Sequence, residues 1–546
     1  MQDFKYQMVK SDYDSFWKKY CGFLDLSIQQ FMLIQQSLLV QQLQQVGSCA
    51  LGKRLIGKKL PRNVKEFRNL VPLTTYEDYL PDLEQENGDS LPEKPYIWAY
   101  TSGTSECASK RVPYTLRSYN NVLEDLMTVF ILACSNGRGH STIAEGDRVL
   151  FNAAPAPYLS GLLAAGANKI LNLKPVYSPE LHDNMDFKEK IAKGFEVSLR
   201  GGVDIIVAMT SVLVKMGNDF NSHSRNSRIS RYLLQPGVIY RFARALVRSK
   251  MERRGILPKD LWPVKALIGW GMDTDIYREQ VKEYWGMYPY EFHACTEAGI
   301  VAVQSWNRKD MTFIPHSNFL EFIPEAESLE NRRDSSYQPR TVLLSEVKPG
   351  ERYELVITGF HGMPLLRYRT GHLIRITSLQ DEEAKVCLPQ MRFEARVDEL
   401  IDIAGFTRLS ERTVAQAIAN VNLDCEDWSI RKEVKGGKLT LHLYMELDNG
   451  YKQKEVTSIL HKELRKIDAF YNDLDSLMDI RPLEVTLLRH GTFNDYYAEK
   501  KSAGAELFQR KPPRMNAPDD SINELIRISG STVEHEDDLV KIPVLV

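Results

Sequence analysis

The spacing of apolar and polar residues changes twice along the chain. Residues 24–46 carry apolar residues at helical spacing without Pro or Gly, which predicts a long helix with a Gln-rich outer face. The run at 95–100 predicts a buried strand, and from residue 148 to about residue 300 short apolar runs alternate with helical patterns. Such alternation predicts a parallel α/β sheet whose ligand-binding loops lie at the carboxyl ends of its strands.

Beyond this region the pattern becomes one of strands joined by short turns that contain Gly. The apolar runs at 319–324, 352–360 and 364–376 predict an antiparallel, barrel-like unit. The last 150 or so residues mix two amphipathic helices with strands of period two, and from about Asp519 the chain reads as a loosely ordered charged tail.

These patterns together predict an α/β protein of two domains. A large N-terminal domain, residues 1–394, would combine mostly parallel sheets with the barrel-like β unit. A small, mobile α+β domain, residues 395–546, would follow. Asp398 is a candidate hinge, although a polar linker residue is an equal reading.

Composition narrows the classes of function. The chain of 546 residues has a net charge of -2, which predicts no attraction to nucleic acid or to anionic membranes. Its seven cysteines are scattered without metal-ligand spacing, which fits a reducing cytoplasm and argues against structural zinc. We also expect no signal peptide and no membrane span, because no apolar stretch approaches 18 residues.

Small hydroxyl residues gather around one glycine in the stretch AYTSGTSECASKRVPYT, residues 99–115, and a lysine follows them. Hydroxyls, backbone N–H groups and an ammonium group are what a polyphosphate loop needs, although a polar surface turn has the same composition. The residues that could meet phosphate are Thr101, Ser102, Gly103, Thr104, Ser105 and Lys110.

This loop and four further segments resemble, in order, the adenylate-forming acyl and aryl ligase superfamily. The closest similarity is to the acyl-acid amido synthetases first known from plant auxin responses, the Gretchen Hagen family. The resemblance covers about residues 20 to 515. The four further segments are VPLTTYEDY (71–79), HACTE (293–297), FIPHSNFLEFIP with GERYELVITGFHGMPLLRYRTGH (313–324 and 350–372), and GTFNDYYAEKKSAGAELFQRKPPR (491–514).

The resemblance implies an enzyme that uses ATP and Mg²⁺ to convert a carboxylic acid to an acyl-AMP. An amine, usually an amino acid, would then attack the acyl carbon. Two alternatives stay open on the sequence alone. Coenzyme A could be the acceptor, as in aryl-CoA ligases, or the chain could be a non-catalytic binding protein on this scaffold.

The resemblance also assigns roles to single residues. It implies that Glu297 holds Mg²⁺, that Thr296 lies by the phosphate, and that Lys110 meets the polyphosphate. Lys511 would enter from the small domain and Arg396 would contact the nucleotide. Each of these residues also has an ordinary reading as a surface charge or loop residue.

Two further pockets follow from the same resemblance. Residues 269–272, with Gly271 among them, would edge the adenine, although a tight turn explains these glycines equally well. Residues 153–161 and 207–211 would supply the pocket for the acyl acid.

Two histidines depart from the family pattern. His372 stands where the family has a ribose-binding aspartate, and His293 stands where it has an aromatic residue beside the adenine. A neutral imidazole has a single acceptor nitrogen, so losing a charge-assisted pair would cost on the order of 1.5–3 kcal/mol of nucleotide affinity.

Overall fold

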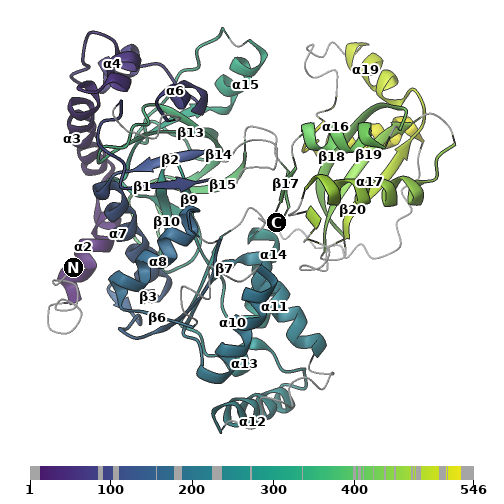
Figure 1. Cartoon of the computed structure of the whole chain (residues 1–546), viewed down its shortest axis with the longest axis horizontal. Coiled ribbons are helices and arrows are strands. Elements are labelled where there is room, and N and C mark those ends of the chain that lie inside the picture. The colour runs from purple at the N-terminus through teal and green to yellow at the C-terminus, as the bar shows by residue number, and fades with distance from the viewer. Residues whose placement is uncertain are drawn as a thin grey trace. The chain divides into compact units, whose positions relative to one another are not determined.

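The structure is a computed structural model of the 546-residue chain. It describes residues 13–83, 90–101, 110–154, 156–176, 187–223, 236–270, 274–334, 336–396, 401–403, 407–409, 411–421, 423–435, 438–447, 450–468, 471–472, 474, 481–502, 512 and 514–530. The chain separates after Val397 into two compact units, and each is described by itself (Figure 1).

One eleven-stranded sheet runs through the large unit, in the order β12-β13-β14-β15-β11-β10-β9-β8-β7-β5-β6. Strands β6, β5, β7, β8 and β9 are parallel, as the alternating pattern predicts. These strands are β5 (Arg148–Asn152), β6 (Lys174–Pro175), β7 (Ile205–Met209), β8 (Ala266–Trp270) and β9 (Tyr290–Cys295). The helices of this part are α8 (Leu159–Leu171), α10 (Phe187–Gly201), α11 (Thr210–His223), α12 (Pro236–Met251), α13 (Pro258–Leu261) and α14 (Thr274–Trp285).

The remaining strands of the sheet pair antiparallel. They are β10 (Gly299–Gln304), β11 (Met311–Phe313), β12 (Asn318–Pro324), β13 (Arg352–Gly359), β14 (Tyr368–Ser378) and β15 (Gln390–Arg396), with α15 (Glu325–Arg333) after β12. The mixed α/β class expected from the sequence is confirmed. The structure adds that the antiparallel strands continue the parallel sheet directly.

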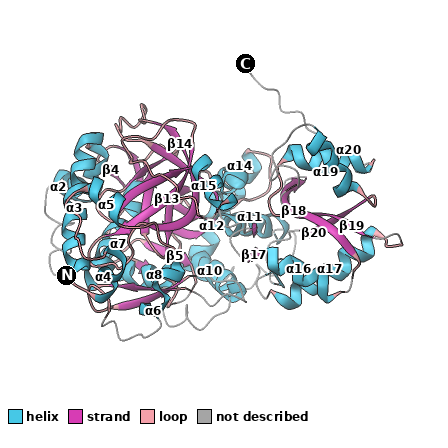
Figure 2. Ribbon diagram, turned by 90° about the horizontal axis from the view of Figure 1, so that it is seen from above, coloured by secondary structure: helices cyan, strands magenta, loops and turns pink. Residues whose placement is uncertain are grey.

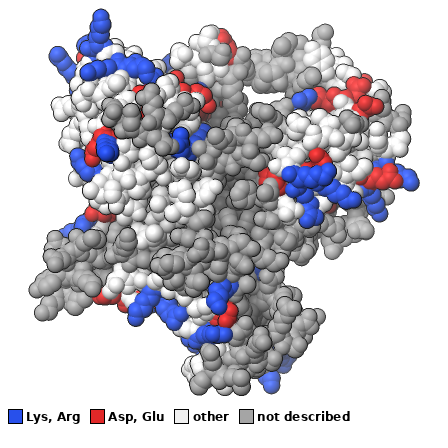
Figure 3. All heavy atoms as spheres, in the orientation of Figure 1, with Lys and Arg blue, Asp and Glu red and all other residues white. Residues whose placement is uncertain are grey.

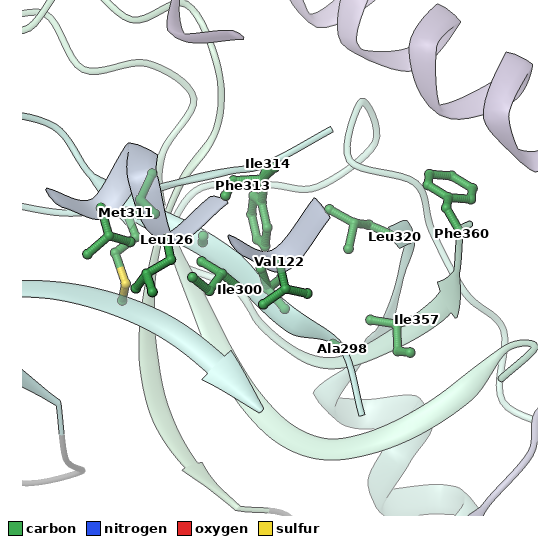
Figure 4. Close-up of a cluster of buried hydrophobic side chains, with 14 of the residues drawn as sticks. Val122, Leu126, Ala298, Ile300, Met311, Phe313, Ile314, Leu320, Ile357 and Phe360 are labelled. Atoms are coloured by element: carbon green, nitrogen blue, oxygen red, sulfur yellow. The ribbon is translucent and has the colours of Figure 1, made fainter. Parts of the chain in front are cut away.

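Helices and two short hairpins complete the large unit. They are α2 (Tyr13–Cys21), η1 (Gly22–Asp25), α3 (Ile28–Gly47), α4 (Ala50–Ile56), α5 (Val64–Leu70), η2 (Tyr76–Tyr79), α6 (Leu80–Leu83), β1 (Ile97–Tyr100), β2 (Arg111–Tyr114), α7 (Leu116–Ala133), β3 (Ser135–Gly137) and β4 (His140–Ser141). Helix α7 lies against the sheet, where Val122 and Leu126 meet Ile300 and Phe313 in the main core (Figure 4). This packing fixes β10, and with it the turn that precedes β10.

The expected helix of residues 24–46 begins later, at Ile28, after a capping box formed by Ser27 and Gln30. The prediction that its glutamines form an outer face is wrong for two of them, because Gln35 and Gln42 are buried. Gln35 donates to the carbonyls of Pro315 and Asn318, both at 2.6 Å, and a buried amide with such partners is satisfied.

The small unit contains a three-stranded sheet with helices on both faces (Figure 2) and a separate two-stranded hairpin of β16 and β17. Its elements are β16 (Ile401–Ile403), β17 (Thr407–Leu409), α16 (Glu411–Asn420), β18 (Cys425–Lys435), β19 (Lys438–Leu447), α17 (Gln453–Ile467), β20 (Arg481–Leu488), α19 (Thr492–Ser502) and α20 (Asp519–Ser529). The expectation of a loose tail from Asp519 is wrong up to residue 529, because Ile522 and Leu525 are buried and anchor α20. Residues from 531 lie outside the described chain.

Charges of both signs occur on each unit, on the face that Figure 3 shows. Among the described residues, we find no helix with the length and apolar content required to cross a membrane.

Candidate active site

The hairpin of β1 and β2 presents the hydroxyl-rich loop. At its open end, Thr101 N–H donates to the Lys110 carbonyl and Lys110 N–H donates to Thr101 Oγ1, both at 3.0 Å. These two bonds close the hairpin directly beneath the loop. The predicted loop residues Ser102, Gly103, Thr104 and Ser105 lie outside the described residues.

Lys110 reaches from this hairpin toward β14 and the end of β9. Its Nζ lies 3.4 Å from the Tyr368 hydroxyl and 4.0 Å from Glu297 Oε1. It also lies 5.4 Å from the centroid of the Tyr76 ring, within the range of a cation–π contact. The side chain of Lys110 is 37% exposed, so the ammonium is held by three groups and stays open to solvent.

Glu297 follows β9, and only 9% of its surface is exposed. The Tyr368 hydroxyl donates to Glu297 Oε1 at 3.2 Å. Burial, and then the neighbouring Glu297 charge, raises the pKa of Tyr368, which keeps the phenol protonated and able to donate. Beside it, the Tyr114 hydroxyl donates to the Thr296 carbonyl at 2.7 Å and fixes the turn that carries both predicted residues.

The two histidines that depart from the family pattern contact one another. His293 Nε2 and His372 Nδ1 are 3.0 Å apart, so one ring donates and the other accepts. Their exposed fractions are 7% and 8%, and Phe393 stacks on His293 with ring centroids 5.1 Å apart. Burial lowers the pKa of His293 to about 4, so this imidazole is neutral near pH 7.

Both contacts are built from the same two strands. His293 and Glu297 are four residues apart at the end of β9, and His372 and Tyr368 are four residues apart in β14. Three strands separate β9 from β14 in the sheet order. Their side chains can meet only because the sheet curls. This curl is what the expectation of a barrel-like unit from the sequence describes.

The structure describes one of three other predicted residues by its backbone and does not describe the other two. Arg396 ends β15 and is the register partner of His372, which puts its backbone beside the histidine pair. Gly271 and Lys511 lie outside the described residues, as does the candidate hinge Asp398. Just beyond Lys511, the Arg514 carbonyl accepts from Ile430 N–H at 2.7 Å, which fixes the end of that motif on β18.

Sequence reasoning missed two residues of this region and a third elsewhere in the large unit. Tyr368 sits in the quoted YRTGH motif, and Tyr76 sits in VPLTTYEDY, where its OH accepts from Arg111 N–H at 2.8 Å. The position of Tyr368 four residues before His372 was the available signal. Asn152 ends β5 with a buried amide oxygen that has no hydrogen-bond partner among the described residues, and its sequence context carries no signal.

The donor set at Glu297 fits a magnesium ion that is bound mainly by a ligand. Within the described chain, no group of three or more His, Cys, Asp or Glu side chains could hold a metal by itself. One carboxylate suits Mg²⁺, which keeps several waters and is commonly bound by one or two carboxylates together with phosphate oxygens.

Comparison with solved structures identifies the fold of the protein. The AtGH3.15 acyl acid amido synthetase in complex with 2,4-DB matches with a TM-score of 0.54 at 18% identity, covering 95% of this chain and 97% of that one. A 2-hydroxyisobutyryl-CoA ligase in complex with 2-HIB-AMP and CoA matches with a TM-score of 0.54 at 15% identity, covering 88% and 92%. The fold is therefore that of the adenylate-forming ligases.

Family models give the narrower assignment. The GH3 family N-terminal, central and C-terminal domains match residues 22–152, 311–396 and 410–519. These matches together span more than half of the chain, and the chain belongs to the GH3 family, a family of ligases. The resemblance expected from the five ordered motifs is confirmed.

Two curated relatives align along most of the chain. Jasmonoyl--L-amino acid synthetase JAR6 of Nicotiana attenuata is 23% identical over 86% of this chain and 88% of its own length. Indole-3-acetic acid-amido synthetase GH3.4 of Arabidopsis thaliana is 23% identical over 82% and 83%. Other alignments are shorter: this chain covers 37% of Jasmonoyl--L-amino acid synthetase JAR4 of Nicotiana attenuata, at 27% identity.

Proposed function

We propose that this protein is an ATP-dependent acyl-acid amido synthetase. It would activate a small carboxylic acid as an acyl-AMP and then transfer the acyl group to an amine, most simply an amino acid. The observation that carries the proposal is the Lys110–Tyr368–Glu297 contact at the base of the hydroxyl-rich loop. It would offer an accessible ammonium to a polyphosphate and a nearly buried carboxylate to its metal.

The proposed reaction depends mainly on positioning the reacting groups and on stabilising the negative charge that develops. Attack of a carboxylate on the α-phosphorus of ATP builds negative charge, and fixed donors lower the barrier by stabilising that charge. Lys110 would supply one such donor, and Tyr368 would hold the Glu297 carboxylate in place. Glu297 would hold Mg²⁺, which neutralises phosphate charge when it is bound.

The remaining predicted residues take their roles from the family. Thr101, Ser102, Gly103, Thr104, Ser105 and Thr296 would line the phosphates, and Gly271, His293, His372 and Arg396 would line the nucleoside. We further propose that residues 1–394 bind ATP and acid, while residues 395–546 bring in Lys511. The cytoplasmic location stays a prediction from cysteine usage.

The proposal is tested by acid-dependent exchange of labelled pyrophosphate into ATP. Exchange with some acids and none without acid would support reversible adenylation. A mass-spectrometric screen of acids with amino acids or coenzyme A would then identify the acceptor. An amide product supports the amido synthetase, a thioester shows a CoA ligase instead, and an absence of exchange with every acid contradicts the proposed activity.

A further inference from the structure

Helix α12 carries apolar side chains on two opposite faces. Its inner face buries Val238, Phe242 and Ala245 where the helix packs against α10 and α13 at the edge of the large unit (Figure 1). Arg241 secures this face by donating to the carbonyls of Leu199 and Arg200, at 2.9 and 3.0 Å. The helix is thus docked on the body by one side only.

The outer face of α12 is also apolar, although it faces solvent. Its large apolar side chains are 48 to 79% exposed, and at 100° per residue they span an arc of about 140°. They are Ile239, Tyr240, Leu246, Val247 and Met251. Single exposed apolar residues need no explanation, but five on one face of a sixteen-residue helix form a surface that no other described part of the chain covers.

Cations accompany this arc. Arg248, Lys250 and Arg253 are exposed, and no acidic side chain of the described residues pairs with any of the three. Lys250 falls within the apolar arc, where a long stem can lie along apolar surface while its ammonium reaches a polar layer. Glu252 is the acidic residue of this segment, and it already pairs with Arg254 at 2.6 Å.

We propose that the outer face of α12, with its five apolar residues, Arg248 and Lys250, binds an anionic lipid surface together with Arg253 just beyond the helix. An apolar arc combined with Lys and Arg is the pattern of helices that lie in a membrane interface. A second copy of the helix offers further cations and no unpaired carboxylate, so charge complementarity favours an anionic surface over self-association. The net charge of -2 is a sum over the whole chain, so it does not reveal the local positive charge of this face.

The test is co-sedimentation of the full chain with lipid vesicles, and it is independent of the proposed activity. We expect binding to vesicles of phosphatidylcholine with phosphatidylserine, at least about fivefold above vesicles of phosphatidylcholine alone, and a decrease with added salt. Y240Q/V247Q removes apolar area and keeps charge, whereas R248Q/K250Q does the reverse. Each pair should lower binding about tenfold.

Matched controls change exposed residues elsewhere on the large unit. L33Q/L70Q controls for lost apolar surface and K58Q/K59Q for lost charge; both should bind like the wild type. Circular dichroism checks that all variants fold. The proposal is overturned if the wild type does not bind anionic vesicles. It is also overturned if the α12 variants bind as well as the controls. A concentration-dependent dimer that Y240Q/V247Q abolishes, without vesicle binding, would assign this face to a second copy.

Discussion

Two side-chain contacts in the large unit are formed by the same two strands but differ in what they can bind. Tyr368 with Glu297, and His372 with His293, each join β14 to the end of β9, four residues apart on both strands. The first contact holds a carboxylate and meets the partly exposed Lys110. The second is a buried pair of rings in which His293 is neutral near pH 7 and is stacked by Phe393.

This difference shows that the side chains, and not the strand geometry, decide which half of the region can meet a charged ligand. The ammonium at the first contact is open to solvent and can attract an anion such as a phosphate. At the second, burial opposes any charge, because a buried imidazole gives up its proton before it becomes an isolated cation. Three changes would break or sharpen the contrast.

The largest effect is expected from removing the charge at the first contact. Lys110→Met keeps the length of the stem and deletes the ammonium, so acid-dependent pyrophosphate exchange should fall by about 100-fold or more. Lys94→Met, at an exposed lysine ahead of β1, is the matched control and should retain the wild-type rate. If Lys110→Met exchanges pyrophosphate as fast as the control, Lys110 is not part of the active site.

The second effect concerns stability and pH. The pKa of His293 is about 4 in the folded chain against 6.5 for a free imidazole, so between these values only the unfolded chain takes up the proton. The free energy of unfolding should therefore fall by about 3 kcal/mol as the pH drops from 6.5 to 4. His293→Phe should remove this loss, measured by urea unfolding of the large unit at both pH values.

His316 supplies a control of opposite sign. Burial lowers its pKa, but the charge and the hydrogen bond of Asp125, at 2.8 Å, outweigh burial and raise it. Its contribution to stability is present below pH 6.5 and is lost as the pH rises through its raised pKa. A pH profile that His293→Phe leaves unchanged would contradict the assignment of the acid loss to His293.

The smallest effect is expected from giving the second contact the charge that it lacks. His372→Asp places a carboxylate beside His293, and if the ribose lies as in the family, ATP should bind about tenfold more tightly by calorimetry. His372→Asn changes the residue without adding charge and should leave the affinity near that of the wild type. Weaker binding in His372→Asp would show that this histidine has a function of its own.

The local parts of this region could be predicted from the sequence. The order of strands and helices, the hairpin loop and the turn at Glu297 follow from short-range patterns that one chain displays. The contact between His293 and His372 could not be predicted, since it depends on the curl of a sheet across three intervening strands. Burial of Gln35 was missed for a related reason: its partners lie some 280 residues further along the chain.

Those glutamines also bear on how the large unit avoids association through its sheet. Strand β12 is the last in the sheet order, and an edge strand with free N–H and C=O groups recruits strands from other molecules. Gln35 occupies this edge with its side-chain amide, accepting from Leu320 N–H at 2.9 Å as it donates to Asn318. Val342 pairs with Phe322 further along. Helix α3 therefore covers the start of this edge with one side-chain amide, which leaves fewer free backbone groups there for a strand of another molecule to pair with.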